Sequence, residues 1–100
     1  MMVDYSQLAV AIDTEYRDTA VLIRPRIDNP VPLTLGYRLT ISQTRDGNTS
    51  NIRQQGELQT GVASSSVQLG LPGNGTCLVH LEVFDTQTLV KSVDRACAAQ

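Results

Sequence analysis

The chain has 100 residues and a net charge of −2, and 41% of its residues are hydrophobic. This length fits one domain, residues 1–100, with enough apolar side chains for a core. Nucleic-acid binders gain most of their affinity by neutralising phosphates, so an acidic chain argues against a nucleic-acid partner. No apolar run reaches the length of a membrane span, so we expect no membrane insertion.

The chain begins without the basic and apolar regions of a signal peptide. We therefore expect either a cytosolic protein or the mature form of an exported one. The sequence has no Trp and only one Phe, so its core depends on Val, Leu and Ile. Branched side chains of this kind favour pleated sheets.

Runs of Val, Ile, Leu, Thr and Tyr recur between turn residues, and helical periodicity is hard to find. This pattern predicts an all-β fold, a single immunoglobulin-like sandwich of about seven antiparallel strands, although a small barrel uses the same pattern. The expected strands cover residues 7–13, 19–27, 34–44, 50–58, 65–71, 77–84 and 89–96.

The first two strands give different information about their place in the sheet. In the first, Leu8, Val10 and Ile12 alternate and should share one buried face. In the second, Pro25 removes a main-chain donor, which argues for an edge position or a bulge.

The third strand has the clearest alternation, with Tyr37, Leu39 and Ile41 expected on its buried face. Asp46 and Gly47 follow it, and both residue types tolerate positive φ, so we expect a hairpin there.

The fourth strand is unusually polar and should face solvent at a sheet edge. The middle of the chain, residues 19–53, is locally basic, and all of its cations are arginine. An exposed edge has free N–H and C=O groups that could pair with a strand of another chain, with arginine adding charge-assisted bonds. The alternative is a solvated edge whose charges only prevent aggregation.

Cys77 and Cys97 lie on what we expect to be the last hairpin, nearly opposite each other. A disulfide is allowed in that register and would favour an oxidising compartment. Two separate buried thiols are the alternative. A zinc site is not expected, because two cysteines and the single His80 do not supply four ligands.

Catalysis has little support in the sequence, and we expect no catalytic residues, no cofactor and no metal. His80 lies on a predicted strand with no nucleophile motif near it, which favours a surface or cross-strand histidine. Asp13 and Glu15 share a strand face, and no apolar surroundings suggest a raised pKa. A binding module therefore fits better than an enzyme.

The segments 37–41 (Tyr-Arg-Leu-Thr-Ile), 47–52 (Gly-Asn-Thr-Ser-Asn-Ile) and 55–58 (Gln-Gly-Glu-Leu) resemble the CsgC/CsgH family of small curli proteins, and most of all its CsgH branch. The resemblance covers about residues 33–58. It implies an immunoglobulin-like sandwich in the periplasm that binds the curli major subunit, or a similar amyloidogenic protein, and prevents amyloid formation before secretion. It also implies a monomer without catalytic activity. Some members of the CsgC branch have a Cys-x-Cys pair, and the wide spacing of the two cysteines here does not match it.

Cross-β growth proceeds by edge pairing of polar, weakly charged segments, which a polar edge bearing arginines can contact transiently. We therefore predict a client-binding surface on the third and fourth strands that combines three cations with three amides: Arg38, Arg45, Arg53, Asn51, Gln54 and Gln55. Two other functions stay open at this point. One is a structural or adhesive module docked permanently into a cell-surface assembly, and the other is a thiol-redox enzyme with a labile disulfide.

Overall fold

The computed structural model describes residues 5–62, 64–70 and 75–96. It contains seven antiparallel strands in two packed sheets, which confirms the predicted all-β sandwich. The strands are β1 (Ala9–Arg17), β2 (Ala20–Asp28), β3 (Thr34–Arg45), β4 (Asn48–Gln59), β5 (Val67–Gly70), β6 (Gly75–Asp85) and β7 (Thr88–Ala96). One sheet has the order β1-β2-β5 and the other the order β4-β3-β6-β7. No helix in the described part is long and apolar enough to cross a membrane.

The core lies between the two sheets and is built from alternate residues of the strands. The predicted inward residues of β3 are buried, as are Leu8 and Ile12, and Val10 packs against the core from a partly buried position. In β6 alternate residues are also buried, and these are Cys77, Val79, Leu81 and Val83. Branched aliphatic side chains therefore fill the core, as the composition predicts.

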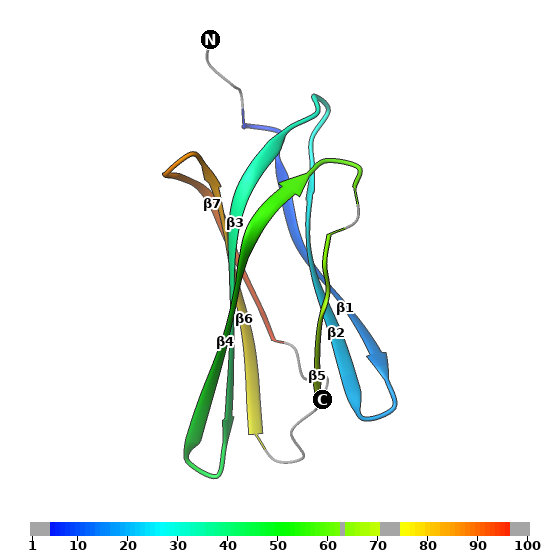
Figure 1. Ribbon diagram of the computed structural model, residues 1–100, viewed down its shortest axis with the longest axis vertical. Coiled ribbons are helices and arrows are strands. Elements are labelled where there is room, and N and C mark those ends of the chain that lie inside the picture. Colours follow the sequence, from blue (N-terminus) through cyan, green and yellow to red (C-terminus); the bar gives the residue numbers. More distant parts are fainter. Residues whose placement is uncertain (1–4, 63, 71–74, 97–100) are drawn as a thin grey trace.

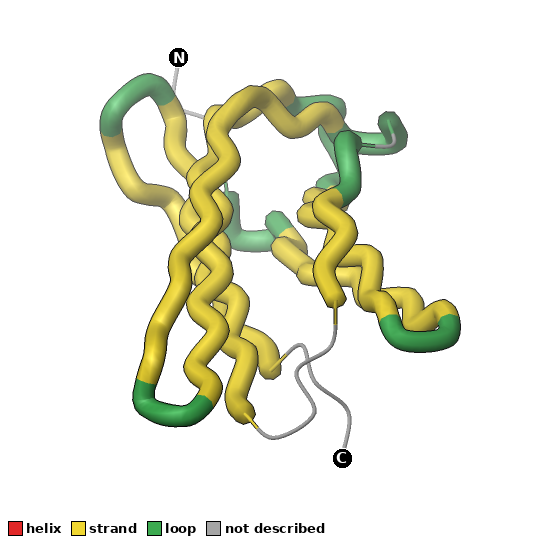
Figure 2. The backbone as a smooth tube through the Cα atoms, turned by 60° about the horizontal axis from the view of Figure 1, so that its bottom comes forward, coloured by secondary structure: helices red, strands yellow, loops and turns green. Residues whose placement is uncertain are grey.

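Three hairpins with two-residue turns join neighbouring strands. Asp46 and Gly47 both have positive φ, 51° and 80°, which confirms the hairpin predicted between β3 and β4. The other two turns are at Asp18-Thr19 and Thr86-Gln87, where Asp18 and Thr86 adopt positive φ. In Figures 1 and 2 the β1–β2 and β3–β4 hairpins diverge at one end of the molecule.

β1 is longer than predicted and ends at Arg17 instead of residue 13. Its last residues are polar on both faces, so alternation gives no strand signal there. The main-chain ladder with β2 continues to Arg17 opposite Ala20. Two exposed ion pairs accompany it: Arg17 bonds Glu15 on the same strand at 3.0 Å, and Arg26 on β2 bonds Asp13 at 2.8 Å. The hydrogen bond and charge of Asp13 raise the pKa of Arg26.

Pro25 is not at a bulge, because β1 and β2 pair without a shift in register. β5 pairs with β2 over Ala20–Ile23, so this part of β2 is not at a sheet edge. At Pro25 itself β5 has ended, and Ser64 Oγ donates to the Pro25 carbonyl at 2.6 Å. The Pro25 main chain therefore points away from β1, so its missing N–H costs the ladder between β1 and β2 nothing.

Candidate functional site

β4 lies at the edge of the four-stranded sheet, with β3 as its only strand neighbour among the described residues, which confirms the predicted edge position (Figure 1). Its side chains are mostly exposed, and Leu58 is the exception that reaches the core. Pairing with β3 is continuous from Thr34 opposite Gln59 to Arg45 opposite Asn48. The polar fourth strand is thus a long, regular and solvent-facing edge.

The register separates the predicted site residues into two groups. In β3 and β4, residues opposite each other point to the same side, and the buried Leu39 lies opposite Gln54. Gln54 therefore faces inward, while Arg38 lies opposite Gln55 on the other side. We call the outer side of the four-stranded sheet the outward face. Its residues on β4, β3, β6 and β7 include Asn51, Arg53, Gln55, Arg38, Thr40, Ser42, His80, Glu82 and Asp94.

The outward face brings four of the six predicted residues together: Arg38, Arg53, Asn51 and Gln55. Asn51 is held in place, because Ser42 Oγ donates to Asn51 Oδ1 at 2.8 Å. Arg38 is also held, with Nη1 at 3.6 Å from Glu82 Oε1 and its guanidinium carbon 5.5 Å from the centre of the Phe84 ring. A fixed cation of this kind loses little conformational entropy when a ligand binds.

Arg53 differs from Arg38 because it makes no ion pair or side-chain hydrogen bond with any residue that the structure describes. It lies opposite Thr40 on β3, in the same cross-strand row as His80 on β6. Its guanidinium therefore keeps all five N–H donors for a ligand. Arg53 is the most available cation of the outward face.

His80 occupies a half-exposed cross-strand position on the outward face, as predicted. Its Nδ1 lies 2.5 Å from Asp94 Oδ1, and its Nε2 lies 3.8 Å from Glu82 Oε2. Glu82 and Asp94 are not among the predicted site residues, although Glu82 alternates with the buried residues of β6 and Asp94 follows the partly buried Val93 on β7. They place negative charge on the β7 side of the outward face and leave the arginines on the β4 side. In the described part of the chain, no three acidic, His or Cys side chains are grouped to hold a metal.

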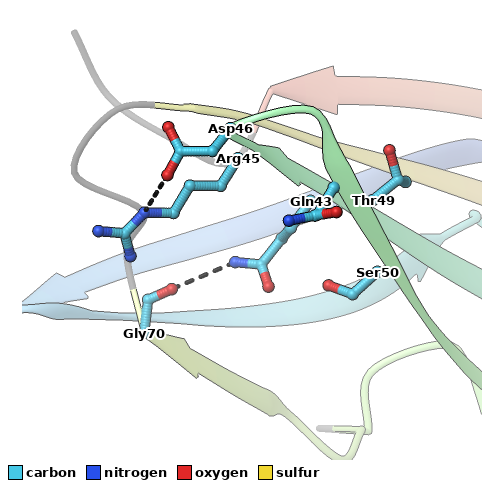
Figure 3. Close-up of a pocket in the computed structure, with 7 residues that line it drawn as sticks. Gln43, Arg45, Asp46, Thr49, Ser50 and Gly70 are labelled. Atoms are coloured by element: carbon cyan, nitrogen blue, oxygen red, sulfur yellow. Dashed lines mark hydrogen bonds and ion pairs between the residues drawn. The ribbon is translucent and has the colours of Figure 1, made fainter.

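Arg45 lies away from the outward face, at the tip of the β3–β4 hairpin (Figure 3). Its Nε is 3.9 Å from the Asp46 carboxylate, beside an open hollow of about 480 Å³. Gln43 spans the hollow and donates from Nε2 to the Gly70 carbonyl at 3.2 Å. Neither Arg45 nor Gln54 joins the surface formed by the other four predicted residues.

Gln54 faces the inner side of β4, between the inward positions of Ile52 and Gly56. Its Oε1 is buried and has no hydrogen-bond partner in the described part. Ile52 is only partly buried against the core. The inner border of β4 therefore has an unpaired acceptor and incompletely covered apolar surface.

Cys77 is buried on β6, at 3% exposure. Cys97 lies outside the described residues, so the disulfide stays a prediction. The last described pair of β6 and β7 is Leu78 with Ala96, one residue from each cysteine. This register is the one that the predicted disulfide requires.

No protein-family model and no curated protein matches the sequence. Among solved structures, CsgH of R. palustris superposes with a TM-score of 0.70 at 15% identity, covering 89% of this chain and 91% of that chain. The E. coli curli protein CsgC superposes with a TM-score of 0.68 at 14% identity, covering 87% and 96%. The sequence resemblance is thus confirmed at the level of architecture: the chain has the immunoglobulin-like fold of CsgH and CsgC.

Proposed function

We propose that this protein is a periplasmic chaperone-like inhibitor. It binds the curli major subunit, or a similar amyloidogenic chain, transiently and prevents premature amyloid formation. It acts by binding and not by catalysis, and it works as a monomer. The fold shared with the curli protein CsgC supports the curli context.

One observation carries the proposal: Arg53, on the edge strand β4, has no ion-pair partner among the described residues, and it lies near the fixed Arg38 on the neighbouring strand β3. Guanidinium groups donate to carboxylates and amide oxygens, which amyloid-forming segments present when they are extended. Asn51 and Gln55 extend this donor surface along β4. Contact of this kind is fast and weak, so it can redirect early oligomers without holding the client permanently.

The test is a dye-monitored fibrillation assay of the purified curli major subunit with this protein present below equimolar amount. Replacing both Arg38 and Arg53 by Ala should shorten the lag toward that of the subunit alone, because electrostatic steering changes association rates about 10-fold or more. Raising the salt concentration should weaken the wild-type protein in the same way.

A matched control distinguishes an effect of the proposed surface from an effect of net charge. Arg24→Ala combined with Arg45→Ala removes two exposed arginines away from the outward face and should leave the lag at its wild-type value. Equal loss of inhibition in both double variants would contradict the proposed surface. A stable stoichiometric complex in size-exclusion chromatography, with no delay of fibrillation, would favour the docking module instead.

A further inference from the structure

The four outer strands of the two sheets differ in how well their edges are protected. Exposed edges have free main-chain groups that can pair with another strand, and proteins block them with charges, bulges or short strands. The edges of β1, β5 and β7 are covered, short or bulged. In the described part, β4 is long and regular, no side chain of another strand covers it, and its edge protection is limited to the charges of Arg53 and Glu57.

The edge of β1 is covered by two cations from β7. Lys91 Nζ donates to the Leu8 carbonyl at 3.1 Å, and Arg95 Nη1 donates to the Ile12 carbonyl at 2.9 Å. The Ile12 main chain points to this edge, because its cross-strand partner Pro25 points away from β1. An incoming strand would have to displace both side chains.

The other two protected edges are broken or short. β7 has a shift in register opposite Val83 and Phe84, which is a bulge that interrupts regular pairing. β5 has only 4 residues.

The edge of β4 is regular over its 12 residues. The two-residue turn makes Arg45 and Asn48 a hydrogen-bonded pair, and every second pair along β3 and β4 is then hydrogen-bonded. The bond from Thr60 N to Leu33 O at 3.1 Å, beyond the other end of the two strands, fits this alternation. The main chains of the alternate residues must then point to the open edge, and these residues are Thr49, Asn51, Arg53, Gln55 and Glu57.

The same residues thus present both free main-chain groups and outward-facing side chains. A strand that pairs with β4 would bond the main chains of Asn51, Arg53 and Gln55 while the Arg53 guanidinium reaches its outward side chains. On the inner side, its alternate residues would cover Ile52 and lie directly beside Gln54 Oε1, where an amide or hydroxyl donor satisfies the buried acceptor.

We infer that the client adds to β4 as an extended β-strand, with weakly charged residues that include an inward-facing amide or hydroxyl side chain opposite Gln54. This inference rests on the proposed function and specifies its mode of recognition. The opposite edge of the same sheet is β7, which the bulge interrupts, and Lys91 and Arg95 cover the β1 edge of the other sheet, so a bound client meets no equally regular edge elsewhere among the described strands. The protein therefore ends a growing sheet instead of extending it.

Gln55→Pro tests main-chain pairing without changing charge. The substitution removes an N–H that points to the open edge, and Pro25 shows that this fold accepts proline at a position that forms no ladder bond with its neighbour. Gln55→Ala is the matched control, since it removes the same side chain and keeps the N–H. The Ala variant loses the Gln55 side chain from the binding surface and should give a lag between that of the wild-type protein and that of the subunit alone. The Pro variant should give a lag equal to that of the subunit alone, so the difference between the two variants measures the contribution of the main-chain N–H.

Equal inhibition by the wild-type protein and the Gln55→Pro variant would overturn strand addition while leaving the proposed function intact. No delay by the wild-type protein would overturn the proposed function itself. A measurement on the unmodified chain complements the variants: amide exchange at Asn51, Arg53 and Gln55 should slow several-fold when the subunit is added. Slowing at Val10 and Ile12 instead would place the client on β1 and contradict the inference.

Discussion

The ring of Tyr37 lies against the main chain of Gly56, its partner across β3 and β4. A Cβ atom added at Gly56 would stand 3.2 Å from Tyr37 Cε1, closer than ordinary van der Waals contact. The buried aromatic ring thus covers a glycine in the edge strand and holds that strand against the core. The geometry of the edge strand, on which the proposed client binding depends, is therefore fixed in part by a core residue.

Gly56→Ala should lower the free energy of unfolding by about 1–3 kcal/mol, because the packed Tyr37 ring must move to admit a methyl group. Denaturant titration measures this loss. Gly70→Ala is the control, since nothing lies within 4 Å of its added Cβ. If the two variants are equally stable, Tyr37 does not pack against β4 in this way.

Lys91→Met combined with Arg95→Met should make the protein self-associate. The substitutions remove both donors to the β1 carbonyls and leave an unprotected edge on which a second copy can pair. Sedimentation velocity over a range of concentrations would detect the association. The control is Arg17→Met combined with Arg24→Met, which removes two cations that do not cover this edge. Monomeric behaviour of the first variant would show that the two cations do not protect β1.

The alkaline limit of stability should depend on Tyr37. Burial raises the pKa of Tyr37 above its usual 10.0, so the folded state favours the neutral ring. Its contribution to stability is present below a pH of about 10 and is lost as pH rises through the folded pKa. Tyr37→Phe should therefore flatten the fall of stability above that pH, as measured by denaturant titration at several alkaline pH values. An unchanged slope would contradict this assignment.

The ionisation of Tyr5 can be measured separately from that of Tyr37 in the alkaline pH range. Its hydroxyl donates to the Asp85 carboxylate, and this hydrogen bond raises the pKa of Tyr5. Spectrophotometric titration of Asp85→Asn should show one tyrosine that ionises at lower pH than in the wild-type protein. No change in the titration curve would exclude the hydrogen bond in solution.

The predicted disulfide between Cys77 and Cys97 should leave no titratable thiol in the unreduced, denatured protein. Closing a loop of this length stabilises a fold by roughly 3 kcal/mol in the chain-entropy account, so reduction should lower the free energy of unfolding by that order. Thiol titration with and without reductant checks the first expectation, and denaturant titration checks the second. Two free thiols in the unreduced protein would favour the alternative of unbonded cysteines.

The sequence predicts the strands best where one face is apolar and the other polar. β3 and β6 show this alternation, and Asp46-Gly47 marks the hairpin that aligns β3 with β4. β1 extends past residue 13 because its main-chain ladder with β2 continues to the two-residue turn, through residues whose side chains give no alternation signal. The missing N–H of Pro25 predicts an edge or a bulge, but the strand neighbours that decide its place in the sheet cannot be identified from local sequence.

The candidate site was predicted by residue type, and the register decides which residues share a face. Gln54 and Gln55 are alike in the sequence, yet one points inward and the other outward. Arg45 resembles Arg53 in charge but lies at the hairpin tip. The contact between Arg95 and Ile12 joins residues 83 positions apart, so no local pattern predicts it.

The most direct test of the account is the fibrillation lag of the curli major subunit with the wild-type protein added well below equimolar amount. The account predicts a clearly longer lag, with the inhibitor eluting as a free monomer afterwards. An unchanged lag at substoichiometric and at equimolar addition would contradict it.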